Sequence, residues 1–422
     1  MSQDSKATFC LPGLCRSFAK ILGGHHADEA ATTEACARAL LADAVDARAS
    51  DIHLDSQPED VRVRFRVDGI VLDIALIPPE RGQRLIRYFK VTANLDPAPA
   101  LLPEDGRCQF EFDGRSSDIR LACAPCVYGD KLALRLSRRS AIRLRLADLG
   151  LGLGDRSQIE HWLGDISGMF VVAGPTGSGK TTTLYALLAE LNLTQRNIVT
   201  IEDPVEYRLG HLNQIEVDAA RGLTFQRGLR SILRLDPDYI LLGEIRDKES
   251  ALIAMEAAAT GRVLLTTMHA RNAAGVITAL RSLNVPNYEI AASLAFIVGQ
   301  RLVRKLCKHC RKAGPASDQE KRWLEDLGEK VPDRVWQASG CEKCNHTGYR
   351  DRTGIFEVLP VDERLYNLIL AEEDEHAIRR HLREEGHHLL LHNGLVKAAE
   401  GITDLSELSR IGAQSYLDRP QS

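Results

Sequence analysis

The residues best suited to chemistry form one glycine-rich segment, Gly174-Pro175-Thr176-Gly177-Ser178-Gly179-Lys180-Thr181. This segment fits the phosphate-binding loop pattern G-x-x-x-x-G-K-[ST]. In such a loop the glycines let backbone N–H groups point at phosphate oxygens, and the following helix adds partial positive charge. We expect Lys180 to reach the terminal phosphates, Thr181 to hold Mg²⁺, and Thr182 to complete the nucleotide contacts.

The neighbouring residues have the pattern that this loop requires. Residues 169–173 read as a short buried strand, and residues 182–191 carry leucines at helical spacing. The alternative is a glycine-rich turn with a solvated lysine. The order strand, loop, helix favours phosphate binding.

Three further segments place polar side chains at the ends of predicted strands. Glu202, Asp203 and Glu206 follow a strand over residues 198–201. Glu244 follows the apolar segment 239–242, which is typical of a Walker B strand. His269 follows a strand over residues 262–268. Each residue alone is more often solvated or structural, but ligands bind at the carboxyl ends of strands in open α/β sheets. The set therefore predicts one catalytic site, with His269 placed to sense the γ-phosphate.

Four cysteines form two C-x₂-C pairs, Cys307 with Cys310 and Cys341 with Cys344. Four thiolates suit tetrahedral Zn²⁺, and a full set of protein ligands is typical of a structural site. The alternatives are four unrelated reduced thiols, or a redox role for one pair. Neither pair opens a thioredoxin-like βαβ unit, which argues against redox chemistry.

Composition limits the class of protein. The chain has 422 residues, a net charge of −4 and 44% hydrophobic residues, so we expect two or three domains and no nucleic-acid partner. No apolar run approaches the ~20 residues of a membrane span, and the N-terminus is a poor signal peptide. Ten cysteines in a chain of this length give no disulfide scaffold. We expect a cytoplasmic protein, at most peripheral to a membrane.

We divide the chain into segments by its patterning. Short alternating strands indicate a small α+β domain, whereas strands alternating with helices around the phosphate loop indicate an α/β core with a parallel sheet. The expected segments are a tail (1–33), the α+β domain (34–138), a linker (139–150), the α/β ATPase core (151–300), the tetracysteine zinc subdomain (301–350) and a helical C-terminal region (351–422). Apolar residues between Leu11 and Leu22 share one helical face, which predicts either a docking helix or a helix that packs on its own domain.

Together these segments resemble the secretion ATPases of type II secretion systems and the extension motors of type IV pili. The motifs that carry the resemblance are similar to that family's Asp box (200–207), Walker B region (222–247), His box (260–269), tetracysteine insert with its flanks (300–357) and second N-terminal domain (49–54, 103–107 and 118–120). Three positions depart from the family pattern. Arg262 replaces a histidine at the start of the His box, and Met268 and Ala270 replace the leucine and the threonine on either side of His269.

The resemblance implies a RecA-like ATPase core preceded by a PAS-like domain, and a homohexamer that hydrolyses ATP to drive assembly of a pilus or pseudopilus. It implies inner-membrane platform proteins as partners. Arg107 and Arg120 match arginines that reach the nucleotide from the N-terminal domain. We expect Glu206 to position the attacking water and Glu244 to hold the Mg²⁺ shell, with the reverse assignment left open.

Three alternatives remain. A pilus-retraction motor shares the nucleotide motifs, but those motors as a family lack the tetracysteine insert. A DNA-uptake or conjugation ATPase would suit the basic residues around Cys307 but not the net charge of −4. A scaffold that binds ATP without turnover would not need the intact carboxylates at residues 202, 203, 206 and 244.

Overall fold

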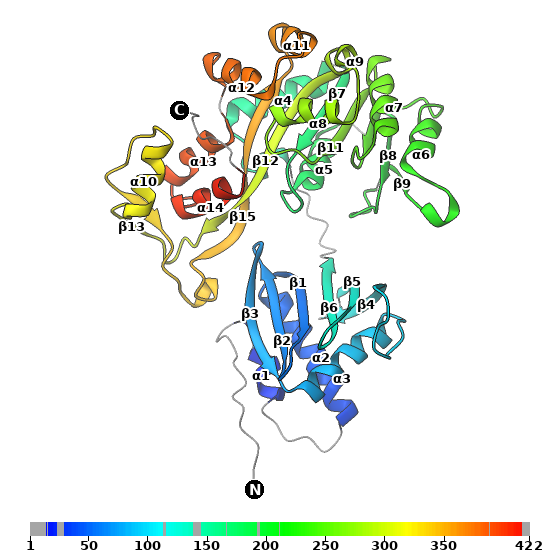
Figure 1. Ribbon diagram of the computed structural model, residues 1–422, viewed down its shortest axis with the longest axis vertical. Helices are drawn as coiled ribbons and strands as arrows, with labels where there is room; N and C mark the ends of the chain where they lie inside the picture. Colours follow the sequence, from blue (N-terminus) through cyan, green and yellow to red (C-terminus); the bar gives the residue numbers. More distant parts are fainter. Residues whose placement is uncertain are drawn as a thin grey trace. The chain divides into compact units, whose positions relative to one another are not determined.

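The computed structural model describes residues 14, 16–22, 29–112, 115–137, 145–165, 167–191, 195–210, 212–387 and 389–415. The chain divides into two compact units (Figure 1). The first unit holds residues 1–141, 307–310 and 339–350, and the second holds residues 142–306, 311–338 and 351–422. Residues 139–144 of the predicted linker (139–150) lie outside the described residues, as do residues 1–13 of the predicted tail.

The first unit is built on a six-stranded antiparallel sheet in the order β3-β2-β1-β6-β5-β4. Its strands are β1 (Ala49–Ser56), β2 (Val61–Val67), β3 (Ile70–Ile77), β4 (Glu104–Phe112), β5 (Arg115–Cys126) and β6 (Gly129–Ser137). Its helices are α1 (Arg16–Leu22), α2 (Glu29–Asp46) and α3 (Pro79–Thr92). This arrangement of strands and helices agrees with the predicted α+β domain.

Alternation along β2 sets the two faces of this sheet. Val61, Val63 and Phe65 are buried in the core, while Arg62 on the opposite face is exposed. Strand residues point alternately to opposite faces, so the apolar residues of this strand build the core and its arginines line the other surface.

Helix α1 packs on its own unit. Phe18 is fully buried, and the backbone N–H groups of Ser17 and Phe18 donate to the carboxylate of Asp43 on α2. Leu14, just before the helix, is buried in the same core. Of the two predictions for the N-terminal apolar face, the described residues support packing on its own domain. Leu11 lies outside the described residues.

The second unit is built on a seven-stranded sheet in the order β15-β12-β7-β11-β10-β8-β9 (Figure 1). Its strands are β7 (Gly168–Ala173), β8 (Ile198–Glu202), β9 (Asn213–Glu216), β10 (Tyr239–Leu242), β11 (Val263–Met268), β12 (Leu294–Leu306) and β15 (Tyr349–Pro360). The six strands from β12 to β9 pair in parallel. These pairings bring the carboxyl ends of β7, β8, β10 and β11 to one edge.

Helices cover both faces of this sheet. Met169 and Val171 of β7 pack in one core, and Phe170 and Val172 pack in the other. The helices of the sheet and its edges are α4 (Leu153–Asp165), α5 (Lys180–Glu190), α6 (Phe225–Ile232), α7 (Lys248–Ala259), α8 (Ala274–Ser282), α9 (Asn287–Ser293), α11 (Glu363–Leu370) and α12 (Glu375–Glu384). A strand buried on both faces reads as a continuous apolar run, which is how β7 appears in the sequence.

A small third core in the second unit joins the end of the chain to β12. Its elements are α10 (Asp318–Asp326), α13 (Leu390–Ala399), α14 (Leu405–Ser415) and the two-stranded sheet of β13 (Lys312–Gly314) and β14 (Val335–Gln337). The buried carboxylate of Glu407 on α14 accepts hydrogen bonds from Arg304 on β12. The structure differs from the sequence prediction at one point, because residues 351–360 continue β15 into the core sheet before the C-terminal helices begin.

Candidate active site

The phosphate loop runs from the end of β7 to the start of α5. Gly177 and Gly179 have φ values of 77° and 89°, in the left-handed region that favours glycine. Gly174 faces a tight contact instead, since a Cβ atom there would lie 2.4 Å from Ser178 Oγ and 2.5 Å from Gln300 O. Backbone conformation at two positions and close approach at a third therefore explain the glycines of the motif.

Lys180 bends back over the loop that it follows. Its Nζ donates to the carbonyls of Gly174 at 2.9 Å and Pro175 at 3.1 Å. Burial lowers the pKa of Lys180 to about 8, the positive charge of Arg301 acts in the same direction, and Glu244 opposes both. Thr181 is exposed at the start of α5, and Thr182 is partly buried beside it. A nucleotide phosphate would replace the carbonyls as the partner of the ammonium group.

Glu244 and His269 lie together at the ends of neighbouring strands. His269 Nε2 is 3.5 Å from Glu244 Oε2, and Arg246 forms an ion pair with the other carboxylate oxygen. The pKa of His269 is lowered, first by burial and then by the charge of Lys180, so the imidazole is neutral at neutral pH. The phosphate loop, the Walker B strand and the His box therefore meet at one edge, as predicted from their order.

The Asp box splits into a buried and an exposed part. Glu202 is 3% exposed, and its carboxylate accepts hydrogen bonds from Tyr185 Oη, Thr200 Oγ1 and Gln214 Nε2. Tyr185 belongs to α5, so Glu202 fixes the helix that carries Lys180. This carboxylate is occupied by protein donors, which suits a positioning residue better than one that contacts the reacting atoms.

Asp203 and Glu206 lie in the exposed loop that follows Glu202. Asp203 Oδ2 is 3.4 Å from Nη1 of Arg246, the same arginine that pairs with Glu244. Arg246 thereby links the Asp box to the Walker B acid. Glu206 is an exposed residue of the same loop, and its role in positioning the attacking water stays a prediction.

Sequence reasoning missed Arg246 and Tyr185. The available signal for Arg246 was its spacing, because Glu244 and Arg246 flank the buried Ile245 and so project to the same side. The guanidinium also lies 5.9 Å from the ring centre of Phe225. Tyr185 gave no such signal, since a tyrosine within an apolar helix reads as an ordinary core residue.

Arg107 and Arg120 lie in the first unit, on β4 and β5. They are directly opposite each other in the sheet register, and Arg135 of β6 is opposite Arg120 on the other side. Like charges at opposite positions destabilise a sheet. Arg135 is compensated by Asp51 at 3.1 Å. The contact of Arg107 and Arg120 with nucleotide stays a prediction.

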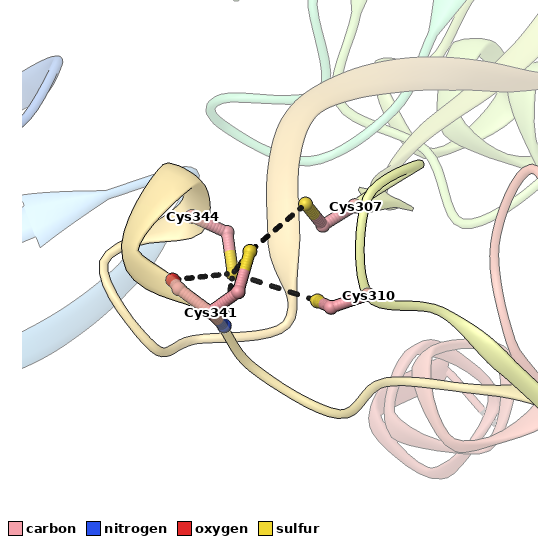
Figure 2. A group of neighbouring side chains, drawn as sticks. All are labelled: Cys307, Cys310, Cys341 and Cys344. Atoms are coloured by element: carbon pink, nitrogen blue, oxygen red, sulfur yellow. Dashed lines mark hydrogen bonds between the residues drawn. The ribbon is translucent and has the colours of Figure 1, made fainter.

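The four cysteines of the two C-x₂-C pairs converge on one point (Figure 2). The Sγ–Sγ distances are 3.9 Å for Cys307 and Cys341, 3.8 Å for Cys310 and Cys344, and 3.7 Å for Cys341 and Cys344. A tetrahedron with Zn–S bonds of about 2.3 Å has edges of about 3.8 Å. These distances are too long for disulfides and fit the predicted Zn²⁺.

The backbone around the cysteines also fits a thiolate cluster. The N–H groups of Gly340 and Gly348 point at Cys310 Sγ and Cys344 Sγ, each at 3.3 Å. The N–H of Cys307 donates to Gly348 O at 2.9 Å, which ties the two pairs together. Donors aimed at sulfur stabilise the negative charge that metal binding requires. The donor set and its surroundings therefore suit a closed structural zinc site.

We expect one Zn²⁺ per chain to co-purify with the protein, and Cys341→Ser to lose both the metal and local stability. Structural zinc is worth on the order of 10–16 kcal/mol of apparent binding energy in small sites. Elemental analysis and thermal unfolding measure the effect, and ADP affinity should stay within about twofold. Cys126→Ser is the control, because Cys126 is an exposed cysteine on β5 outside the cluster. Folded protein without zinc would contradict the assignment.

Among the described residues, no helix is both long enough and apolar enough to cross a membrane.

Sequence comparison gives a consistent family. A family model described as "Type II/IV secretion system protein" matches residues 26–410. The chain is 41% identical over 377 residues to the type II secretion system ATPase E of Vibrio cholerae, covering 89% of this chain and 75% of that protein. It is 40% identical over 386 residues to type II secretion system protein E of Aeromonas hydrophila, covering 91% and 76%.

Solved structures show the same fold at lower identity. The ATPase DotB of Legionella pneumophila matches with a TM-score of 0.65 and 22% identity, covering 89% of this chain and 95% of that one. The pilus retraction motor PilT with bound ADP matches with a TM-score of 0.57 and 22% identity, covering 89% and 96%. The motifs, the fold and the sequence matches agree, and the chain belongs to the type II/IV secretion system ATPase family.

Proposed function

We propose that this protein is the ATP-hydrolysing motor of a type II secretion system and that it powers assembly of a pseudopilus. The observation that carries the proposal is the convergence of Lys180, Glu244 and His269 at one edge of the core sheet. Identities of about 40% to type II secretion proteins support the choice of system. The tetracysteine cluster supports an assembly motor over a retraction motor.

The residues of this edge have distinct tasks in hydrolysis. Backbone N–H groups of the loop and Lys180 bind the phosphate chain of ATP. Thr181 and Glu244 would hold Mg²⁺, which would supply neutralisation of the phosphate charge. Glu206 orients the attacking water, and His269 senses the γ-phosphate from a neutral imidazole. Arg107 and Arg120 complete the site by spreading the developing charge.

We further propose the domain arrangement and the assembly in which ATP hydrolysis drives secretion. The core (151–300) is RecA-like, the domain over 34–138 is PAS-like, and residues 301–350 are a zinc subdomain that precedes the C-terminal region (351–422). Six chains form a ring on the cytoplasmic face of the bacterial inner membrane and bind the platform proteins of the secretion system there. Family membership supports this arrangement.

A steady-state ATPase assay at increasing protein concentration tests the proposal. Turnover per subunit should rise with concentration, because a ring completes sites that a single chain leaves open. Lys180→Ala is the control for contaminating activity, since it removes the phosphate contact. ATP binding without turnover above that control at every concentration would show a nucleotide-dependent scaffold instead of a motor.

A further inference from the structure

Three consecutive residues near the middle of β12, Gly299 to Arg301, contact both loops of the active site. We call them the brace segment. Strand β12 lies parallel to β7, and Gly299 is the register partner of Ala173, the last residue before the phosphate loop. The brace segment therefore lies at the level where the phosphate loop leaves the sheet.

Gln300 holds the phosphate loop. Its side chain is 2% exposed, and its Nε2 donates to Ser178 O at 2.8 Å. Its Oε1 accepts a hydrogen bond from Thr183 Oγ1 on α5 at 2.7 Å. One amide thus fixes the loop to the first turn of its helix, and both of its ends are used. A buried amide with both ends satisfied specifies a single arrangement of its neighbours.

Gly299 and Arg301 hold the segment that follows His269. Arg301 is 7% exposed, and it donates through Nη1 to Gln300 O at 2.9 Å and through Nη2 to Arg271 O. Gly299 lets the same segment approach closely, since a Cβ atom there would lie 3.1 Å from Ala273 N. Arg271 is two residues beyond His269, so a hydrogen bond to its carbonyl restrains the backbone that carries that imidazole.

Arg301 is also a buried cation whose charge Glu357 helps to stabilise. Burial lowers the pKa of Arg301 to about 10, and Glu357 opposes this shift. The two guanidinium hydrogen bonds described above nevertheless go to backbone carbonyls, that of Gln300 within the brace segment and that of Arg271 in the segment after His269. The charge of Arg301 also contributes to the lowered pKa of Lys180. A guanidinium is suited to this task because its planar donors reach two acceptors in fixed directions.

We propose that the brace segment fixes the phosphate loop and His269 at one separation, through Gln300 on one side and Arg301 on the other, so that the two loops act on the same phosphate. This assignment makes Gln300 and Arg301 positioning residues, which act through Ser178 and His269 without contacting the nucleotide. It rests on the proposed role of His269 in ATP hydrolysis.

A double-mutant cycle tests the Arg301 half. Arg301→Lys keeps the charge but loses the planar guanidinium that reaches two carbonyls in fixed directions, so turnover should fall about tenfold with ADP affinity within about twofold. If Arg301 acts through His269, the same substitution in a His269→Gln background should cost less than about twofold. Arg304→Lys is the matched control, because Arg304 lies on the same strand and binds Glu407 away from both loops. It should lower thermal stability at most, with turnover unchanged.

Nucleotide binding tests the Gln300 half without using turnover. Gln300→Glu keeps the shape and the acceptor for Thr183 but sets a carboxylate against Ser178 O, so ADP affinity should fall at least about tenfold. Wild-type affinity in this variant would overturn the Gln300 half. Equal losses from Arg301→Lys in both backgrounds would overturn the Arg301 half. Wild-type turnover in His269→Gln would overturn the proposed role of His269 and the Arg301 half with it, while the ADP measurement still decides the Gln300 half.

Discussion

Glu206→Gln is expected to bind ATP with Mg²⁺ normally and to hydrolyse it about 10²–10⁴ times more slowly, the range for loss of a general base or water-positioning group. Glu206 is exposed to solvent in the loop after Asp203. Glu244 lies between Arg246 and His269. A carboxylate with a partner on each side is better suited to the Mg²⁺ shell than to positioning a mobile water.

The matched variant is Glu244→Gln. It should also lose turnover, with a visibly raised Mg²⁺ requirement, because a neutral amide is a poorer partner for the hydrated cation. Titrating Mg²⁺ at saturating ATP separates the two variants. If Glu206→Gln turns over near the normal rate while Glu244→Gln is inactive with ordinary Mg²⁺ dependence, the two carboxylates have exchanged roles.

Arg107→Ala and Arg120→Ala should each reduce turnover by about 10³-fold or more, with a much smaller effect on ATP affinity. An arginine supplied to a phosphoryl-transfer site is worth about 10³–10⁵ in rate. The two arginines are directly opposite each other on β4 and β5. Directly opposite residues lie on the same face of an antiparallel pair, so both guanidinium groups can face one polyanion.

Arg62→Ala is the control for the arginine variants. Arg62 is on the same sheet, and its exposed ion pair with Asp73 contributes little to stability, so turnover should remain within about twofold. Mixing Arg107→Ala chains with Lys180→Ala chains then asks whether the arginine serves its own chain or a neighbour. Restored turnover in the mixture indicates a neighbour. Near wild-type turnover in both arginine variants alone would make them ordinary surface charges.

Local patterns predicted much of this structure because they depend on residues close in sequence. Strand β2, Val61–Val67, lies in the domain where short alternating strands were predicted, since strict alternation of apolar and basic residues is typical of a half-buried strand. The tetracysteine cluster is also assembled as expected. The spacing of two C-x₂-C pairs predicts that the four thiols converge, because a metal site defines the separation of its ligands.

Long-range partnerships were not readable in the same way. Glu202 is buried and accepts a hydrogen bond from Tyr185 Oη, and nothing in the segment 198–206 specifies that hydroxyl partner. Gln300 and Arg301 interrupt an apolar strand, and this pattern indicates that their side chains have polar partners in the structure. Their partners at Ser178 and Arg271 follow only from strand order, because β12 pairs with β7 across more than a hundred residues.

That strand order also determines when the nucleotide site matures during synthesis. The amide of Gln300 reaches a carbonyl 122 positions earlier in the chain. At about 5–20 residues per second, a ribosome needs about 6 to 24 s to supply this partner after the phosphate loop has been made. The antiparallel sheet of residues 49–137 needs no such delay, because all of its strands precede the ATPase core. Newly made chains should therefore pass through a stage in which the sheet of residues 49–137 is folded and ATP has no finished site to bind.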